Sequence, residues 1–163
     1  MRSQTHAGSK PGEAGAALQA ARRAAMGAFA RATLPELRLG LDQLDAATSC
    51  EMLRRPETGL VMLRGRIGGV GAPFNVGEAT VTRAVMRLAT GETGFSYVLG
   101  RDKEKARLAA LADALWQQDT MRAAVEQRLV RPVKARLAAE EQRRAAQAAA
   151  TKVEFFAMAR GED

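Results

Sequence analysis

Four arginines in the middle of the chain are the residues best suited to chemistry. Arg64 and Arg66 lie in one short segment, and Arg83 and Arg87 lie in the next. Residues two or four apart share a face of a β-strand, so each pair shares a face if these segments are strands. Guanidinium groups bind phosphates and carboxylates through two parallel hydrogen bonds. If helices cover one side of the sheet, we expect all four arginines to converge on the other.

This arginine surface has more than one interpretation. Leu60 and Met62 share a strand face with the first pair, and Val81 and Val85 share a strand face with the second. A mixture of apolar residues and arginine is typical of protein interfaces. The arginines would then meet carboxylates of a partner, or alternatively the phosphates of a ligand. A solvated outer face with scattered charge is the third possibility.

A glycine-rich connection and two polar residues lie between the arginine pairs. Gly68, Gly69 and Gly71 could present backbone N–H groups to a phosphate, although neither a P-loop nor a dinucleotide-binding fingerprint is present. We favour a tight strand connection in which glycine permits a positive φ. Glu78, with Thr82 nearby, could orient a ligand hydroxyl, but a cross-strand pair with an arginine is the interpretation that we favour.

General acid–base and nucleophilic catalysis have few residues to use. The chain has one histidine, His6, and one cysteine, Cys50. Without a neighbouring base we expect Cys50 to be a small core residue. One cysteine cannot form an internal disulfide or hold an iron–sulfur cluster alone, and a zinc site is not expected. The sequence therefore predicts no catalytic, cofactor or metal site belonging to this chain alone.

The hydrophobic pattern predicts an α+β fold, with a four-stranded antiparallel meander flanked by N-terminal and C-terminal helices. Thr33 and Glu36 form a capping box, and Asp102 is a good N-cap. The residues between Arg55 and Gly59 give a turn signal around Pro56. The predicted strands are 49–55, 60–67, 74–88, with a bulge near Gly77, and 95–99. The predicted helices after the sheet are 103–118, 120–130 and 132–151.

The two ends of the chain differ in composition. Residues 1–13 are rich in glycine and polar side chains, and we expect them to be disordered, with 14–163 forming a single domain. The end of the chain is apolar and contains Phe155, Phe156 and Met158. Such a tail is expected to dock, either on its own sheet or on a partner.

The net charge of the chain indicates which classes of partner it can bind. The net charge is +7 and the pI about 10.5, which favours anionic partners. A nucleic-acid-binding module is an alternative function, but aromatic residues make up only 4% of the chain, so few stacking platforms are available. No apolar run is long enough for a membrane span, and no secretory signal is apparent. We expect a cytoplasmic protein.

Several segments together resemble a known family. They are Thr58-Gly59-Leu60, Gly68-Gly69-Val70-Gly71, Gly77-Glu78-Ala79-Thr80-Val81-Thr82-Arg83, Gly100-Arg101-Asp102-Lys103 and the ending Phe155 to Glu162. In this order they resemble the small G subunits (PhnG) of the bacterial carbon–phosphorus lyase core complex. The resemblance extends from about Thr33 to the C-terminus.

The resemblance implies a cytoplasmic assembly with subunits of the H, I and J types, used to obtain phosphate from organophosphonates. With the I-type subunit, and with H and L also needed, such proteins support attack of methylphosphonate on the ribose of ATP. Adenine leaves, and α-D-ribose 1-methylphosphonate 5-triphosphate forms. A radical SAM subunit, J, later cleaves the carbon–phosphorus bond. The chain would then be a subunit that is inactive alone, with ATP as a substrate of the complex and the I type as its most direct partner.

Overall fold

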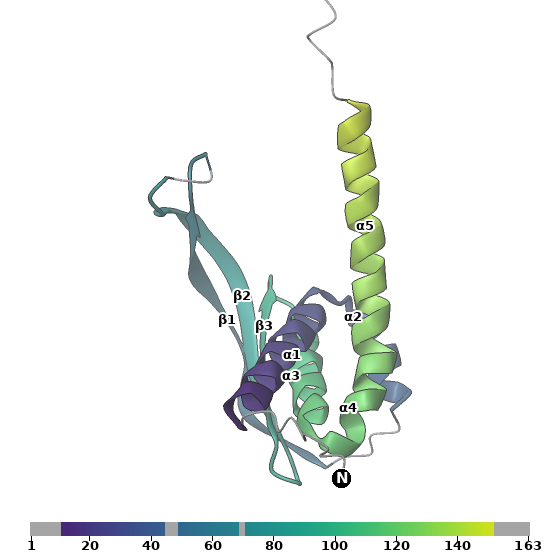
Figure 1. Ribbon diagram of the computed structural model, residues 1–163. Helices are drawn as coiled ribbons and strands as arrows, with labels where there is room; N and C mark the ends of the chain where they lie inside the picture. Colours follow the sequence, from purple (N-terminus) through teal and green to yellow (C-terminus); the bar gives the residue numbers. More distant parts are fainter. Residues whose placement is uncertain (1–10, 45–48, 69–70, 152–163) are drawn as a thin grey trace, which may run out of the picture. The chain divides into compact units, whose positions relative to one another are not determined.

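The computed structural model describes residues 11–44, 49–68 and 71–151, and for 11–14 it describes the backbone only. These residues belong to two units, 1–133 and 134–163. The first unit contains α1 (Pro11–Arg31), α2 (Leu34–Asp42), β1 (Cys50–Gly65), β2 (Phe74–Leu88), β3 (Thr93–Leu99), α3 (Lys103–Gln117), α4 (Asp119–Val125) and the π-helical turn η1 (Glu126–Val130). The long helix α5 (Arg131–Ala150) begins there and forms the described part of the second unit (Figure 1).

The sheet is an antiparallel meander of three strands in the order β1-β2-β3, so the expected four strands are wrong. The two segments predicted as separate strands are one strand, β1, which continues through the supposed turn at Pro56. Proline is tolerated there because β1 lies at the edge of the sheet, where a missing N–H costs no ladder bond on the outer side. Register shifts between Met52 and Arg54 and between Arg54 and Glu57 accommodate the irregular residues.

β2 has the predicted bounds, and its register also shifts near Gly77, as expected. Leu63 lies opposite Gly77, whereas the next residue, Arg64, lies opposite Asn75, so Val76 is the extra residue of a bulge. β3 pairs only with residues 81–87 of β2. Beyond that point β1 and β2 continue as a two-stranded extension, residues 60–65 and 74–80, which we call the outer ribbon.

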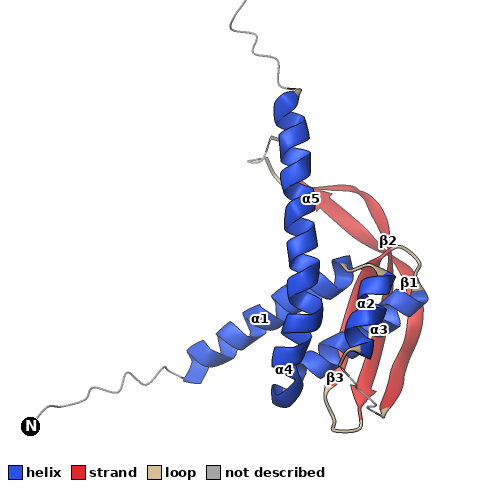
Figure 2. Ribbon diagram, turned by 90° about the vertical axis from the view of Figure 1, so that its right-hand side faces the viewer, coloured by secondary structure: helices blue, strands red, loops and turns tan. Residues whose placement is uncertain are grey.

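Helix α3 crosses one face of the sheet (Figure 2). Asp102 caps it, since its side chain accepts a hydrogen bond from the Lys105 N–H at 2.8 Å. α3 lies so close to Gly94 of β3 that a β-carbon there would overlap the backbone of Ala110 and Ala114. The sheet residues beneath the helix form the core with it: Thr82, Ala84, Met86, Leu88, Ser96 and Val98.

The other helices largely follow the sequence signals. The predicted capping box of Thr33 and Glu36 is present at the start of α2. The predicted break between helices 120–130 and 132–151 is absent, because α4 continues through the π-helical turn η1 into α5. Proline has no N–H for the preceding turn, and its ring crowds the carbonyl four residues earlier, so a widened turn relieves that conflict. In the second unit, every residue from 141 to 151 is exposed.

Candidate functional site

Arg83 and Arg87 lie on the face of the sheet that points away from α3. Arg83 Nη2 is 3.1 Å from Glu57 Oε2, and Arg87 Nη2 is 3.0 Å from Glu51 Oε2, so both are paired with carboxylates of β1. Hydrogen bonds to Glu57 and then to Tyr97 raise the pKa of Arg83. Both pairs are exposed to solvent and contribute little stability. These two arginines are engaged within the chain.

Arg64 and Arg66 lie elsewhere, and the structure does not bring the four arginines together. Arg64 is opposite Asn75 in the outer ribbon, and Arg66 follows the end of β1. Because Thr58 of β1 pairs with Thr82 of β2, the even-numbered residues of β1 from Thr58 to Arg64 share the helix side of the sheet. Arg64 therefore points to the side opposite that of Arg83 and Arg87. Alternation within each strand was correct, but the register between the strands decides which faces match.

Glu78 does not have the cross-strand arginine that we favoured. It lies opposite Met62, and none of the ion pairs found among the described residues includes it. Glu51 and Glu57 of β1 have that role instead.

Thr82 is placed where it stabilises the structure. It is fully buried, and its Oγ1 donates a 2.7 Å hydrogen bond to the Gly100 carbonyl and lies 3.1 Å from the Thr58 hydroxyl. The Gly100 N–H donates to the Thr80 carbonyl at 2.9 Å, with Gly100 itself at a φ of 92°. Three segments of the sequence resemblance therefore meet at the foot of the outer ribbon. Next to them is a shallow depression lined by Thr58, Gly59, Leu60, Thr80 and Arg101.

The glycine connection is described in part. Gly68 has a φ of 64°, and the Gly71 N–H donates to the Ile67 carbonyl at 3.3 Å. A β-carbon at Gly71 would lie 2.9 Å from that carbonyl oxygen. Both observations agree with a tight connection that needs glycine. Gly69 lies outside the described residues, as do Phe155, Phe156 and Met158, and phosphate binding by this loop stays a prediction.

Cys50 is exposed, so the expectation of a core residue is wrong. It is the first residue of β1, an edge strand, opposite Leu88 at the end of the sheet. In the part of the chain that the structure describes, no three residues among His, Cys, Asp and Glu gather as a metal site would require. His6 lies outside that part.

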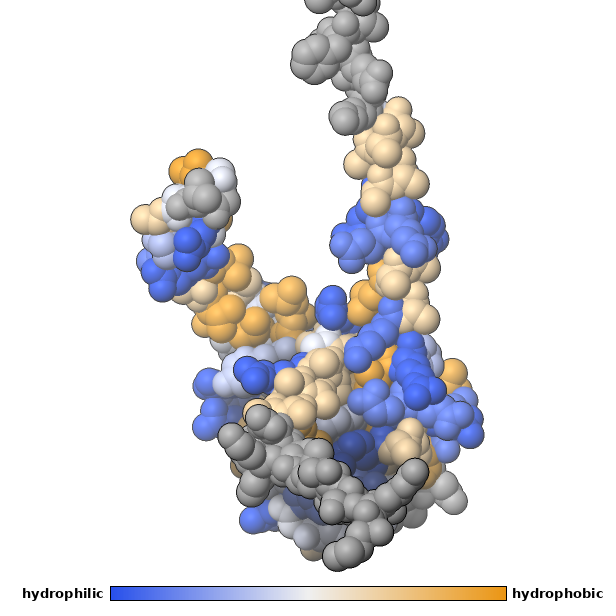
Figure 3. Space-filling model, viewed as in Figure 1, coloured by the Kyte–Doolittle hydropathy of each residue, from blue (hydrophilic) through white to orange (hydrophobic). Residues whose placement is uncertain are grey.

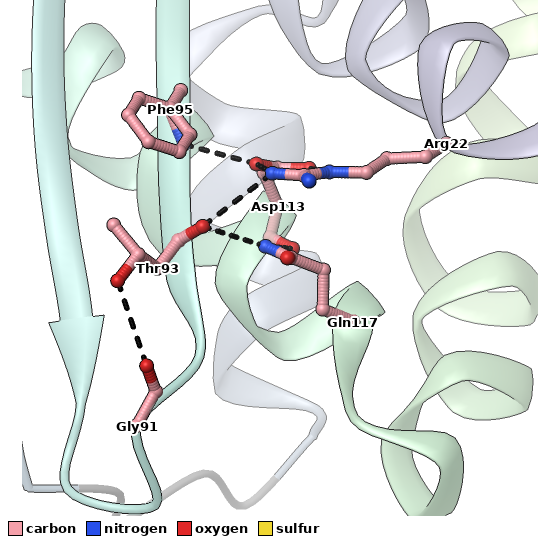
Figure 4. Close-up of polar contacts among 6 residues, drawn as sticks. All are labelled: Arg22, Gly91, Thr93, Phe95, Asp113 and Gln117. Carbon is pink, nitrogen blue, oxygen red and sulfur yellow. Dashed lines mark hydrogen bonds and ion pairs between the residues drawn. The ribbon is translucent and has the colours of Figure 1, made fainter. Parts of the chain in front are cut away.

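A buried ion pair at the free edge of β3 was missed in the sequence (Figure 4). Asp113 of α3 is fully buried; it accepts the Phe95 N–H at 2.9 Å and pairs with Arg22 of α1 at 2.7 and 3.0 Å. Gln117 donates to the Thr93 carbonyl at 2.8 Å. The hydrogen bond with Asp113 raises the pKa of Arg22 against the opposing effect of burial. The one available signal was an acid within the buried, alanine-rich side of α3.

Two surfaces of the sheet carry groups of exposed apolar side chains. One is the outer ribbon, where Leu60, Met62, Leu63, Phe74 and Val76 are between 44% and 62% exposed, and hydrophobic surface is visible on it in Figure 3. The other is the side of the sheet away from α3, which we call the outer sheet face. It carries Arg83, Arg87 and three exposed residues of β3: Phe95, Tyr97 and Leu99. Both surfaces have the composition of an interface.

The placement of charge gives little support to a nucleic-acid-binding module. Such a module needs a stripe of cations open to phosphates, but several of the described arginines are paired with carboxylates. These are Arg22, Arg38, Arg83, Arg87, Arg122 and Arg136. None of the described helices is long and apolar enough to cross a membrane.

Two comparisons with known proteins agree. The family model described as phosphonate metabolism protein PhnG matches residues 20–161. A protein of Rhizobium meliloti (strain 1021), named alpha-D-ribose 1-methylphosphonate 5-triphosphate synthase subunit PhnG, is 56% identical over 144 residues. The alignment covers 88% of this chain and 92% of that relative, so the similarity includes the sheet, the outer ribbon and the helices around them.

Proposed function

The chain belongs to the PhnG family of phosphonate metabolism proteins, and we propose that it is the G subunit of an α-D-ribose 1-methylphosphonate 5-triphosphate synthase. In this role it supports the formation of that product from ATP and methylphosphonate during organophosphonate catabolism. The observation that carries the proposal, beyond family membership, is the pair of exposed apolar surfaces on a chain with few reactive groups. Such surfaces suit a subunit of an assembly.

The chain's contribution is proposed to be structural. Proton transfer and nucleophilic attack need a positioned base, acid or nucleophile. Cys50 is exposed and has no histidine available among the described residues, and Glu51 and Glu57 are in ion pairs. The groups that activate methylphosphonate and release adenine are therefore assigned to another subunit. No cofactor is proposed for this chain alone, and ATP is a substrate of the complex.

The proposed partners are subunits of the I, H and J types, most directly the I type. This follows the sequence resemblance, in which the I type supplies the reaction with the ribose of ATP. The outer ribbon and the outer sheet face both expose apolar side chains suited to such contacts. The assembly is proposed to be cytoplasmic, where ATP is available.

Co-expression tests the proposal directly. The I, H and L subunits of the same bacterium are purified with and without this chain, and methylphosphonate-dependent release of adenine from ATP is measured. We expect release only when this chain is present, and none from the chain alone. Full activity without it, or turnover by the isolated chain, would contradict the proposed role.

A further inference from the structure

The outer ribbon exposes apolar side chains on both of its faces. The register places Leu60 and Met62 on the helix side, where they are 62% and 54% exposed. Leu63 and Phe74 belong to the opposite side and are 45% and 44% exposed. A two-stranded ribbon is marginally stable in water unless its apolar surface is covered. To cover both faces, a partner must surround the ribbon, as a groove does, because a flat surface could cover only one face.

The charges of the ribbon indicate the chemistry of that occupant. Arg64 and Arg66 have no ion-pair partner among the described residues. Arg83 and Arg87, by contrast, are neutralised by Glu57 and Glu51. Unpaired arginines beside exposed leucine and methionine match an apolar groove whose rim carries carboxylates.

A second copy of this chain is a poor occupant. The carboxylates on neighbouring β1, Glu51 and Glu57, are already held by arginines of their own sheet. Two ribbons packed against each other would bring Arg64 and Arg66 of both copies together with Glu78 as the one ribbon carboxylate of each copy, so positive charge would be in excess. Charge complementarity therefore favours a different polypeptide.

We infer that the outer ribbon is the segment by which this chain enters its assembly, inserted into an apolar groove with an acidic rim on another synthase subunit. This inference rests on the proposed function and adds to it the docking segment and the chemistry of the partner surface. The outer sheet face then contributes less than the outer ribbon to association with that subunit.

A pair of matched double variants tests the inference. Leu60→Ser with Met62→Ser removes apolar surface from the outer ribbon. Leu18→Ser with Leu39→Ser removes apolar side chains that are 43% and 61% exposed on α1 and α2, outside both the outer ribbon and the outer sheet face. Each full-length variant is purified separately and titrated into a preparation of the I, H and J subunits, and its affinity for them is measured. We expect the ribbon variant to bind roughly a hundredfold more weakly and the control variant to bind within about twofold of the unmodified chain.

Charge reversal supplies an independent test. Arg64→Glu with Arg66→Glu should weaken association roughly tenfold or more, with the greatest effect at low salt. We expect each variant to keep its fold, because all the altered residues are exposed or half-exposed. Circular dichroism of each variant verifies this. Unchanged association of both ribbon variants would overturn the inference while leaving the proposed function intact.

Two further outcomes are decisive. If the isolated, unmodified chain is a dimer by light scattering and the ribbon variants are monomeric, a second copy occupies the ribbon and the inference is wrong. If the unmodified chain binds no synthase subunit at all, the proposed function fails and the inference fails with it.

Discussion

Two regions of the sheet differ in how their polar and apolar groups are covered. They are the free edge of β3, which we call the closed end, and the outer ribbon, which we call the open end. At the β3 edge, Asp113, Gln117 and Arg22 satisfy the backbone groups of Thr93 and Phe95 from within the chain. At the outer ribbon, β1 and β2 extend beyond β3 with leucine, methionine and arginine exposed. An unprotected strand edge or ribbon invites pairing with another chain. The contrast indicates that one end is built for stability and the other for contact.

Breaking the closed end should have the largest effect on stability. Asp113→Ala leaves the Phe95 N–H and the Arg22 guanidinium without their buried acceptor. Removing one partner of a buried ion pair costs about 3–5 kcal/mol, and because Arg22 keeps some solvent contact we expect the lower end. Urea denaturation of the full-length chain measures the free energy of unfolding.

The exposed pair of Arg83 and Glu57 is the matched control for that experiment. Glu57→Ala removes a carboxylate that is half exposed, so the expected loss is below about 1 kcal/mol. Equal losses for Asp113→Ala and Glu57→Ala would show that the β3 edge is not specially stabilised.

Gly94→Ala probes the same end through packing. The added methyl group would overlap the backbone of Ala110 and Ala114, so α3 must move away from the sheet. Overpacking of this kind costs about 1–3 kcal/mol, and contact with backbone atoms places it at the upper end. Thermal unfolding monitored by circular dichroism measures the effect. Gly59→Ala is the control, because no atom lies within 4 Å of a β-carbon at Gly59, and a loss as large as that of Gly94→Ala would contradict this account.

The junction between the two ends depends on a buried hydroxyl. Thr82→Val keeps the volume of the side chain but removes the hydrogen bonds to the Gly100 carbonyl and the Thr58 hydroxyl. We expect a loss of about 1–2 kcal/mol in the free energy of unfolding. Thr82→Ser keeps both hydrogen bonds and separates their contribution from that of the methyl group. If the valine variant is as stable as the unmodified chain, these bonds do not secure the foot of the ribbon.

Local signals predicted the elements that depend on neighbouring residues. The capping box of Thr33 and Glu36, the N-cap Asp102 and the bounds of β2 were all correct, because each is determined within a few residues. The turn signal at Pro56 was misleading because proline at a sheet edge can be absorbed by register shifts. The length of β1 therefore depended on the edge position, which no local pattern reveals.

The candidate site depended on register, which is a long-range property. Alternation placed Arg83 and Arg87 on one face correctly, but whether Arg64 joins them is decided by the pairing of Thr58 with Thr82. A shift of one residue would have brought Arg64 to the same side. The ion pair of Arg22 and Asp113 joins residues 91 positions apart, and the position of Asp113 on the buried side of α3 does not identify Arg22 as its partner.

The smallest expected effect belongs to the open end. Leu60→Thr replaces a side chain that is 62% exposed in the outer ribbon with a residue that favours strands, so the full-length chain should lose no more than about 0.5 kcal/mol. The same urea denaturation used for Asp113→Ala measures it. A loss close to that of Asp113→Ala would mean that Leu60 is packed within the isolated chain, and the ribbon would then be part of the core. A near-zero change, combined with weakened association, is the result that separates a contact surface from a stabilising one.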